Sequence, residues 1–213
     1  MSPGKHRKPQ ASRRAAGAAV SAPEGLDFTA HMRRLCHDLV ARTATLAHVD
    51  MERVAVGFTQ ARKPTVHGMY AALTPLRFAG GRTHSVHRGR KWGVERLFAP
   101  DGREMLYVLT FYLPRYLNLP FREKLTTVLH ELWHIGPKFD GDLRRFDGRC
   151  FAHGASQKQY DARLAELLEQ WLRQSPPAAL TEFLRHDYQE LVARYGRVVG
   201  HKVRPPKLVL VDG

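Results

Sequence analysis

The feature that most constrains the fold of this chain is an amphipathic stretch from Phe121 to Ile135. Pro120 precedes it, and proline is favoured at the start of a helix because its missing N–H group needs no partner there. Gly136 and Pro137 follow, where a helix ends readily. The apolar residues recur at spacings of three and four, at Phe121, Leu125, Val128, Leu129, Leu132 and Trp133. This period predicts an α-helix with one broad face buried against other elements.

A short motif with chemical meaning lies on this helix. His130-Glu131-Leu132-Trp133-His134 spells HExxH, and helix residues four apart lie within about 40° of each other around the axis. Both imidazoles can therefore hold one metal ion, for which we expect Zn²⁺, one per chain. Glu131 is rotated away from the pair but near enough to take a proton from a metal-bound water. The motif predicts His130 and His134 as metal ligands and Glu131 as the catalytic general base.

A catalytic zinc normally needs a third protein ligand and keeps one position for water. His153 is our candidate, because it follows an irregular segment able to fold back and directly precedes Gly154. A solvent-exposed loop histidine is the alternative reading of His153. A Cys150 ligand is also open, although thiolates are commoner in closed structural zinc sites. The carboxylate rivals for the third position are Asp147, Asp161 and Glu166.

Tyrosine hydroxyls are candidates for stabilising an oxyanion near such a metal. Tyr160, Tyr188 and Tyr195 lie in the C-terminal part of the chain, and each is equally compatible with a buried ring whose hydroxyl reaches the surface. The histidines without partner spacing are interpreted as surface or loop residues, and they are His84, His87, His186 and His201. Trp133 is interpreted as core packing.

The sequence before the motif predicts one helix and several strands. Asp27 is placed to cap a helix that continues toward Leu46 and carries its apolar residues at helical spacing. Arg53 to Thr59 and His67 to Phe78 have strand patterns. Trp92 to Phe98 and Arg103 to Leu113 flank a Pro-Asp-Gly turn and predict a hairpin. Between these strands, Gly80 to Lys91 is expected to be a long surface loop near the site.

After the motif, Lys138 to Gly154 is expected to be irregular. Amphipathic helices are predicted near Ser156 to Gln174 and Ala178 to Tyr195, and a strand near Lys207 to Val211. The order of helix, strands and then mainly helices predicts an α+β fold, a mostly antiparallel sheet with helices packed on it and the HExxH helix at its centre.

Length and charge set the domain organisation and the partners. The chain has 213 residues and a formal net charge of +14, which fits one domain over residues 25–213 after a disordered basic arm over residues 1–24. No apolar run is long enough to span a membrane, and two cysteines are too few for a disulfide framework. We therefore expect a cytoplasmic protein with reduced thiols. Oligomeric state is not predicted.

Nucleic acid is a possible partner because a basic surface that neutralises phosphates releases counterions. The basic arm and a basic loop would supply this surface, the loop through Arg82, Arg88, Arg90 and Lys91. A solvated basic surface without a dedicated partner is the alternative.

Two parts of the sequence resemble known families. HELWH with the later His153-Gly154 resembles the SprT-like zincins, whose motif is HExxH and a later His-Gly. The stretch Val54 to Phe78, with Tyr70-Ala71-Ala72-Leu73 and Pro75-Leu76-Arg77-Phe78, is similar to phage metallopeptidase domains. The likeness covers roughly residues 28–170. It implies a minimal zincin domain with His153 as third ligand, and a role beside DNA in a phage or mobile element.

Three hypotheses about function follow. The first is a zinc-dependent peptidase that cleaves a protein or peptide substrate with a metal-activated water. The second is a nucleic-acid-associated binding protein whose metal site is structural or degenerate. The third is a metal-dependent hydrolase of another bond, such as an amide in a cell-wall peptide. Glu131 favours an enzyme, because a structural site needs ligands but no base.

Overall fold

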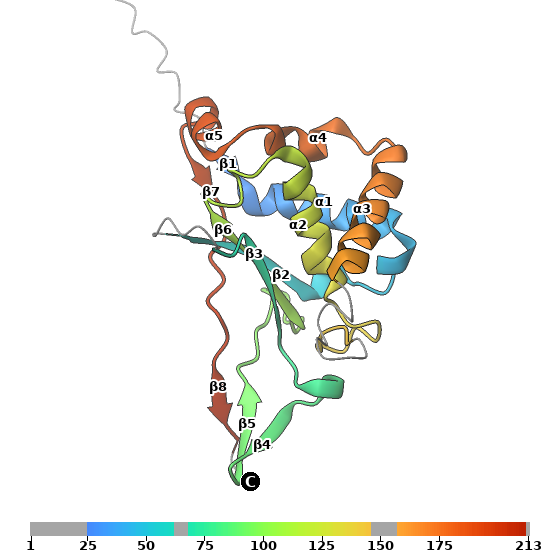
Figure 1. Cartoon of the computed structure of the whole chain (residues 1–213). Coiled ribbons are helices and arrows are strands. Elements are labelled where there is room, and N and C mark those ends of the chain that lie inside the picture. The colour runs from blue at the N-terminus through green and yellow to red at the C-terminus, as the bar shows by residue number, and fades with distance from the viewer. Residues whose placement is uncertain (1–24, 62–67, 146–156, 212–213) are drawn as a thin grey trace, which may run out of the picture.

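The computed structural model describes residues 25–61, 68–145 and 157–211. The expected basic arm, residues 1–24, lies outside these residues. The described chain has an α+β fold in which helices cover one face of a small central sheet (Figure 1). The helices are α1 (Phe28–Arg42), α2 (Phe121–Trp133), α3 (Gln157–Arg173), α4 (Ala178–Thr181) and α5 (Tyr188–Tyr195). The strands are β1 (Leu26–Asp27), β2 (Val54–Gln60), β3 (Ala71–Pro75), β4 (His84–His87), β5 (Arg90–Val94), β6 (Tyr107–Leu113), β7 (Val198–Val199) and β8 (Leu208–Leu210).

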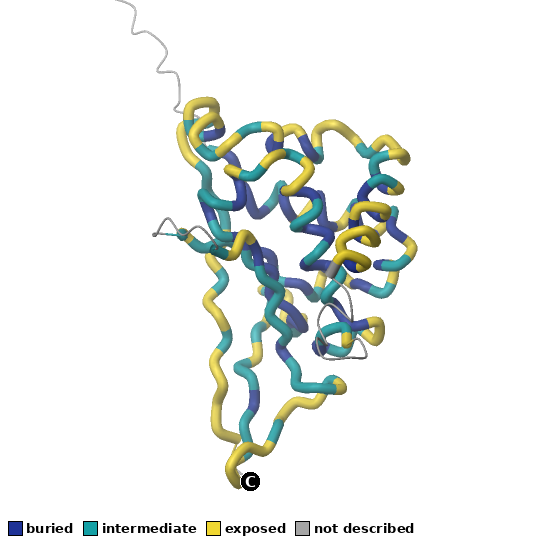
Figure 2. Tube along the Cα trace, in the orientation of Figure 1, coloured by how far each residue is buried: buried dark blue, intermediate teal, exposed yellow. Residues whose placement is uncertain are grey.

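Helix α1 begins and ends for identifiable reasons. The Asp27 carboxylate accepts a hydrogen bond from the backbone N–H of Ala30 at 2.9 Å, as expected of an N-cap. The helix ends at Arg42, earlier than the sequence pattern suggested, because Thr43 is extended and Leu46 belongs to a separate 3₁₀ turn, Ala44–Leu46. Its apolar face is buried in the core (Figure 2).

The central sheet has the strand order β2-β6-β3 and is mixed. Strand β6 pairs with β2 in parallel, from Val54↔Tyr107 to Gln60↔Leu113, and with β3 antiparallel. The expectation of antiparallel pairing therefore holds for β3 but not for β2. Strand β6 is central and mostly buried, whereas β3 forms an edge of this sheet. That edge faces α2, which packs against β3.

The predicted hairpin forms its turn, but its two arms do not pair as strands. The N–H of Ala99 donates to the carbonyl of Arg103 at 2.8 Å, and Gly102 takes the positive φ of 84° that the turn requires. Pairing continues briefly beyond the turn, through an antiparallel bridge between Phe98 and Glu104 and a hydrogen bond from the N–H of Met105 to the carbonyl of Leu97. The two arms then diverge, since β5 pairs with β4 and β8 whereas β6 lies between β2 and β3, where its side chains are mostly buried.

The segment Gly80 to Lys91 was expected to be a loop near the site, and that expectation is wrong. It contains β4 and the start of β5, joined by a tight turn at Arg88 and Gly89, which have φ values of 49° and 72°. Strand β8 adds to the other edge of β5. The tip of this unit points away from α2 (Figure 1).

The last expected helix is interrupted. In place of one helix, α4 and a 3₁₀ turn, Glu182–Arg185, are followed by α5, which begins at a new cap. Asp187 accepts a hydrogen bond from the N–H of Glu190, and the Glu190 side chain accepts one from the N–H of Asp187. This capping box starts a separate helix. Helix α3 and strand β8 agree with the sequence prediction.

Candidate metal centre

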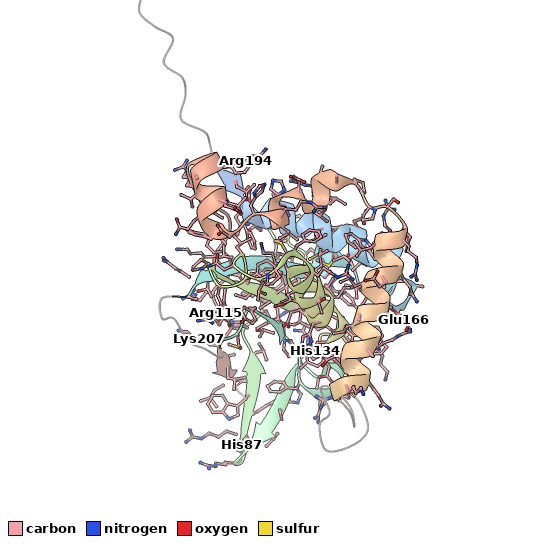
Figure 3. The ribbon with its side chains drawn as sticks, turned by 45° about the horizontal axis from the view of Figure 1, so that its top comes forward. His87, Arg115, His134, Glu166, Arg194 and Lys207 are labelled. Carbon is pink, nitrogen blue, oxygen red and sulfur yellow. The ribbon has the colours of Figure 1, made fainter. Side chains whose placement is uncertain are left out.

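The two histidines of the HExxH motif converge at the C-terminal end of α2. Their Nε2 atoms lie 3.0 Å apart, and their ring centroids are separated by 4.6 Å. His130 is in the last turn of α2 and His134 is its C-cap residue, so a regular helix provides the spacing. Figure 3 labels His134 at this end, beside α3. Two imidazole nitrogens this close together can serve as two of the ligands of one zinc ion.

Glu131 lies between the two histidines in sequence and is almost fully buried, with 8% of its surface exposed. Its Oε2 accepts a hydrogen bond of 2.8 Å from the backbone N–H of Leu73 in β3. Burial raises the pKa of the Glu131 carboxyl to about 7, although the Leu73 hydrogen bond opposes this rise. A carboxyl group with a pKa near neutrality is suited to accept and release a proton.

A pocket of about 240 Å³ opens beside Glu131 and His130. Its walls come from α2 and from the beginning of the β3 edge, and the remaining lining residues are Tyr70, Ala71, Thr126 and Thr127. Because β3 is an edge strand, some of its backbone groups face away from the sheet. The pocket therefore combines the histidine and glutamate side chains with a strand edge.

Tyr160 of α3 completes one side of the histidine pair. Its ring lies edge-on to His130, with centroids 5.3 Å apart, and is stacked against His134 at 6.1 Å. The residue is 6% exposed. Burial, reinforced by the nearby charge of Glu131, raises the pKa of its hydroxyl, so the group stays protonated at neutral pH. Of the three tyrosines considered from sequence, Tyr160 is the one that contacts both histidines.

The chain folds back immediately after α2. The N–H of Arg144 donates to the carbonyl of His134 at 2.7 Å, and its guanidinium donates to the carbonyl of Trp133 at 2.8 Å. The same guanidinium lies 4.3 Å from the centre of the Trp133 ring, so Trp133 is half-buried beneath it. Tyr107 supports the fold-back by donating to the carbonyl of Asp142 and accepting from the N–H of Gly141. The irregular character expected for this segment is confirmed over residues 138–145.

The third ligand is not identified by the described residues. His153, Asp147 and Cys150 all lie in residues 146–156, outside the part of the chain that is described. Within the described part, no group of three His, Cys, Asp or Glu side chains is placed to hold a metal. Asp161 and Glu166 are exposed on α3, and Glu166 accepts hydrogen bonds from Arg163 and Gln170. These two carboxylates are therefore not brought to the histidine pair.

Arg144 and Tyr160, which lie before and after residues 146–156 in the sequence, both contact the histidine pair. Arg144 is bonded to the carbonyl of His134, and Tyr160 contacts both imidazole rings.

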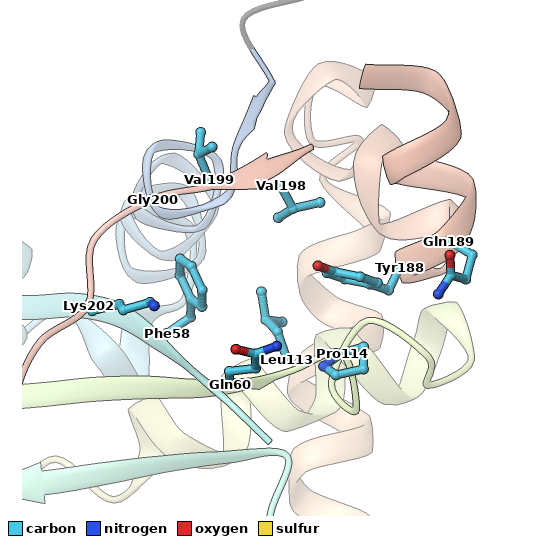
Figure 4. A pocket seen from close by; sticks show the side chains of 10 residues that line it. All are labelled: Phe58, Gln60, Leu113, Pro114, Tyr188, Gln189, Val198, Val199, Gly200 and Lys202. Atoms are coloured by element: carbon cyan, nitrogen blue, oxygen red, sulfur yellow. The ribbon is translucent and has the colours of Figure 1, made fainter. Parts of the chain in front are cut away.

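A separate pocket of about 460 Å³ lies between the ends of β2 and β6 and the C-terminal segment (Figure 4). Phe58 and Leu113 form apolar walls, and Tyr188 and Lys202 supply polar groups. It shares no lining residue with the pocket at Glu131, and none of its lining residues is His, Cys, Asp or Glu. Tyr188 therefore lies in a different pocket from the one beside the histidine pair.

Comparisons with protein-family models, curated proteins and solved structures find no match to this chain. None of the helices in the described part is long and apolar enough to cross a membrane. Function is therefore inferred from the geometry of the residues themselves.

Proposed function

We propose that this chain is a zinc-dependent peptidase in which His130 and His134 hold the metal and Glu131 acts as general base. The observation that carries the proposal is the 3.0 Å separation of the two Nε2 atoms with the buried Glu131 carboxyl between them in sequence. A structural metal site would need the histidines but would have no use for a buried carboxyl group with a pKa of about 7. We take His153 as the third ligand.

The chemistry divides between the metal and the protein. When bound, zinc supplies Lewis acidity, which lowers the pKa of a water molecule and polarises the scissile carbonyl. Glu131 accepts the proton of the attacking water and delivers it to the leaving amine. The N–H of Leu73 holds the Glu131 carboxyl in place at 2.8 Å. The Tyr160 ring lies against both histidines, and in this proposal its protonated hydroxyl donates a hydrogen bond to the developing oxyanion.

The strand edge supports a peptide rather than a small substrate. An extended peptide can add to an exposed sheet edge through main-chain hydrogen bonds. The pocket at Glu131 is lined by Tyr70 and Ala71 at the beginning of the β3 edge. Because Glu131 already binds the N–H of Leu73, the proposed peptide lies at the part of the edge formed by Tyr70 and Ala71, which lines the pocket together with His130 and Glu131.

The first experiment measures zinc per chain in the wild type and in His130→Ala, His134→Ala and His153→Ala, with His84→Ala as the control on an exposed histidine. We expect near-stoichiometric zinc in the wild type and the control and loss of zinc in the three other variants. Zinc retained in His153→Ala would reject that residue as the third ligand. An absence of zinc from the wild type after reconstitution would reject the metal site.

Casein cleavage then tests the role of Glu131. Glu131→Gln should keep zinc but lose activity, whereas Glu123→Gln, an exposed glutamate on the same helix, should keep both. Full casein activity in Glu131→Gln would refute the general-base assignment. Activity on a cell-wall peptide amide without casein cleavage would point to another amide as the substrate.

A further inference from the structure

Strands β4, β5 and β8 form a three-stranded antiparallel ribbon that projects from the helical body (Figure 1). It joins segments that are far apart in sequence, with Trp92 opposite both Ser85 and Leu210. Little of the ribbon is buried in the described structure (Figure 2). An unsupported projection of this kind is available to a partner.

The ribbon and its connections are strongly basic, although Glu95 directly follows β5 and accepts a hydrogen bond from the backbone N–H of Lys207. Neither Ala79 to Val94 nor Gly200 to Val211 contains an aspartate or glutamate. Their lysines and arginines are Arg82, Arg88, Arg90, Lys91, Lys202, Arg204 and Lys207. Within the described part of the chain, none of these side chains forms an ion pair. Their charge is therefore not neutralised by the protein.

The cations near the tip point to both faces of the ribbon. Arg90 pairs with His87 and Lys91 with Val86, and neighbouring residues of a strand face opposite sides. Arg88 occupies the turn between them. Figure 3 shows His87 near the tip and Lys207 near the base of β8. Positive charge thus lies on both faces of the β4–β5 hairpin, which β8 and Val211 flank along one edge as far as Lys91.

We propose that this ribbon binds double-stranded DNA by entering a groove between two phosphate backbones. A two-stranded ribbon fits the major groove of B-form DNA, and the β4–β5 hairpin at the end of this three-stranded unit is the part that would enter it, with cations on both faces able to reach the phosphates on either side. The deep, narrow major groove of duplex RNA excludes the same element. Trp92 is half-buried, which reduces the ring area on which single-stranded bases could stack.

Contacts of this kind set affinity and orientation without reading sequence. The exposed apolar residues Val86, Leu208 and Leu210 lie on the same ribbon, and they could instead serve a membrane surface or a second copy of the chain. The excess of seven lysines and arginines over one acidic residue, Glu95, in residues 79–95 and 200–211 favours a polyanion over self-association. The proposal is independent of the metal site.

The test compares two full-length variants with equal changes in net charge. In the ribbon variant, Arg88, Arg90 and Lys91 become Gln; in the control, Arg34, Lys158 and Arg173, exposed cations on α1 and α3, become Gln. Binding of a mixed-sequence DNA duplex of about 20 base pairs is followed by fluorescence anisotropy over a range of salt concentrations. Thermal unfolding and circular dichroism check that each variant is folded.

For the ribbon variant we expect affinity to fall roughly tenfold to a hundredfold at 0.15 M salt, and the slope of log K against log salt to fall by about 2 to 3. The control should change much less, and DNA sequence should have little effect. If the triple variant does not fold, single Arg90→Gln and Lys91→Gln variants should each reduce the slope by about 1.

Equal losses in the two triple variants would overturn the assignment to the ribbon, as would binding that depends only on residues 1–24. Equal affinity for duplex RNA, or preference for phosphatidylserine vesicles over DNA, would overturn the choice of partner. A dimer that forms without DNA and is broken by Val86→Ser would identify a self-association surface in its place.

Discussion

Glu104 precedes the central strand β6 and binds two arginines, and its replacement tests how much these ion pairs contribute to the stability of the fold. Its Oε1 accepts hydrogen bonds of 2.6 Å from both Arg96 and Arg77, and its side chain is 15% exposed. These contacts, first Arg96 and then Arg77, lower the pKa of Glu104 from 4.5 to about 2. Such a difference between the folded and unfolded chain corresponds to about 3 kcal/mol of stability at neutral pH.

The expected effect is smaller because Arg96 is 61% exposed and solvent screens its charge. We expect Glu104→Gln to lower the free energy of unfolding by about 1–2 kcal/mol at pH 7. A carboxyl group with a lowered pKa stabilises the fold above pH 4.5, and this contribution disappears as pH falls toward 2. The gap between wild type and variant should therefore shrink by more than half at pH 3.

Urea unfolding at pH 7, 5 and 3 measures this gap. Glu166→Gln is the matched control, because Glu166 also forms an ion pair with an arginine, but its side chain is 54% exposed. Its replacement should change stability by less than about 0.5 kcal/mol at every pH. A gap for Glu104→Gln that is the same at pH 7 and pH 3, or no larger than that of the control, would refute the reasoning.

Three further predictions concern buried polar groups. Lys124 is 2% exposed and donates hydrogen bonds to two backbone carbonyls after α4. Lys124→Met should therefore lower the free energy of unfolding, measured with urea, by about 2–4 kcal/mol, because the carbonyls lose their donor. Arg122→Met, at an exposed site on the same helix, should have little effect. Tyr160→Phe should lower kcat for casein about tenfold or more with zinc content unchanged, and unaltered kcat would exclude its hydroxyl from catalysis. In zinc-free protein, Glu131→Gln should raise stability at pH 8, because burial disfavours the ionised carboxylate, whose pKa is raised to about 7. This advantage should disappear toward pH 4.5 as the wild-type carboxyl becomes protonated, and a variant less stable at pH 8 would contradict it.

The sequence alone determined the elements whose signals are local. Helix α2 could be predicted from the period of its apolar residues and from Pro120, and the spacing of His130 and His134 followed from helix geometry. Helix α1 could be predicted in the same way from its cap at Asp27. The turn at Pro100 and Gly102 could also be predicted, because proline restricts its own φ angle and glycine permits a positive φ angle.

Only the tertiary structure decided how these elements pair. Local pattern favoured a hairpin between β5 and β6, but β6 lies between β2 and β3, where its apolar side chains are mostly buried, and only residues next to the turn pair with the end of the other arm. The last helix is interrupted because the Asp187 cap starts a new helix and Lys124 binds the carbonyls at the break. The Asp187 and Glu190 spacing of the capping box is a local signal that the sequence carries, whereas the contact of Lys124 with the carbonyls depends on tertiary packing.

The candidate site also contains residues that the sequence predicts and contacts that only the tertiary structure shows. The sequence supplied His130, Glu131 and His134, since a helix fixes residues one and four positions apart. It did not supply the hydrogen bond from Leu73 to Glu131, because a backbone N–H carries no sequence signal. The sequence also did not distinguish Tyr160 from the other candidate tyrosines. Only the packing of α3 on α2 places its ring against both histidines. Chemistry held within one helix could be determined from the sequence, whereas groups contributed by neighbouring strands and helices depend on long-range packing, which only the tertiary structure fixes.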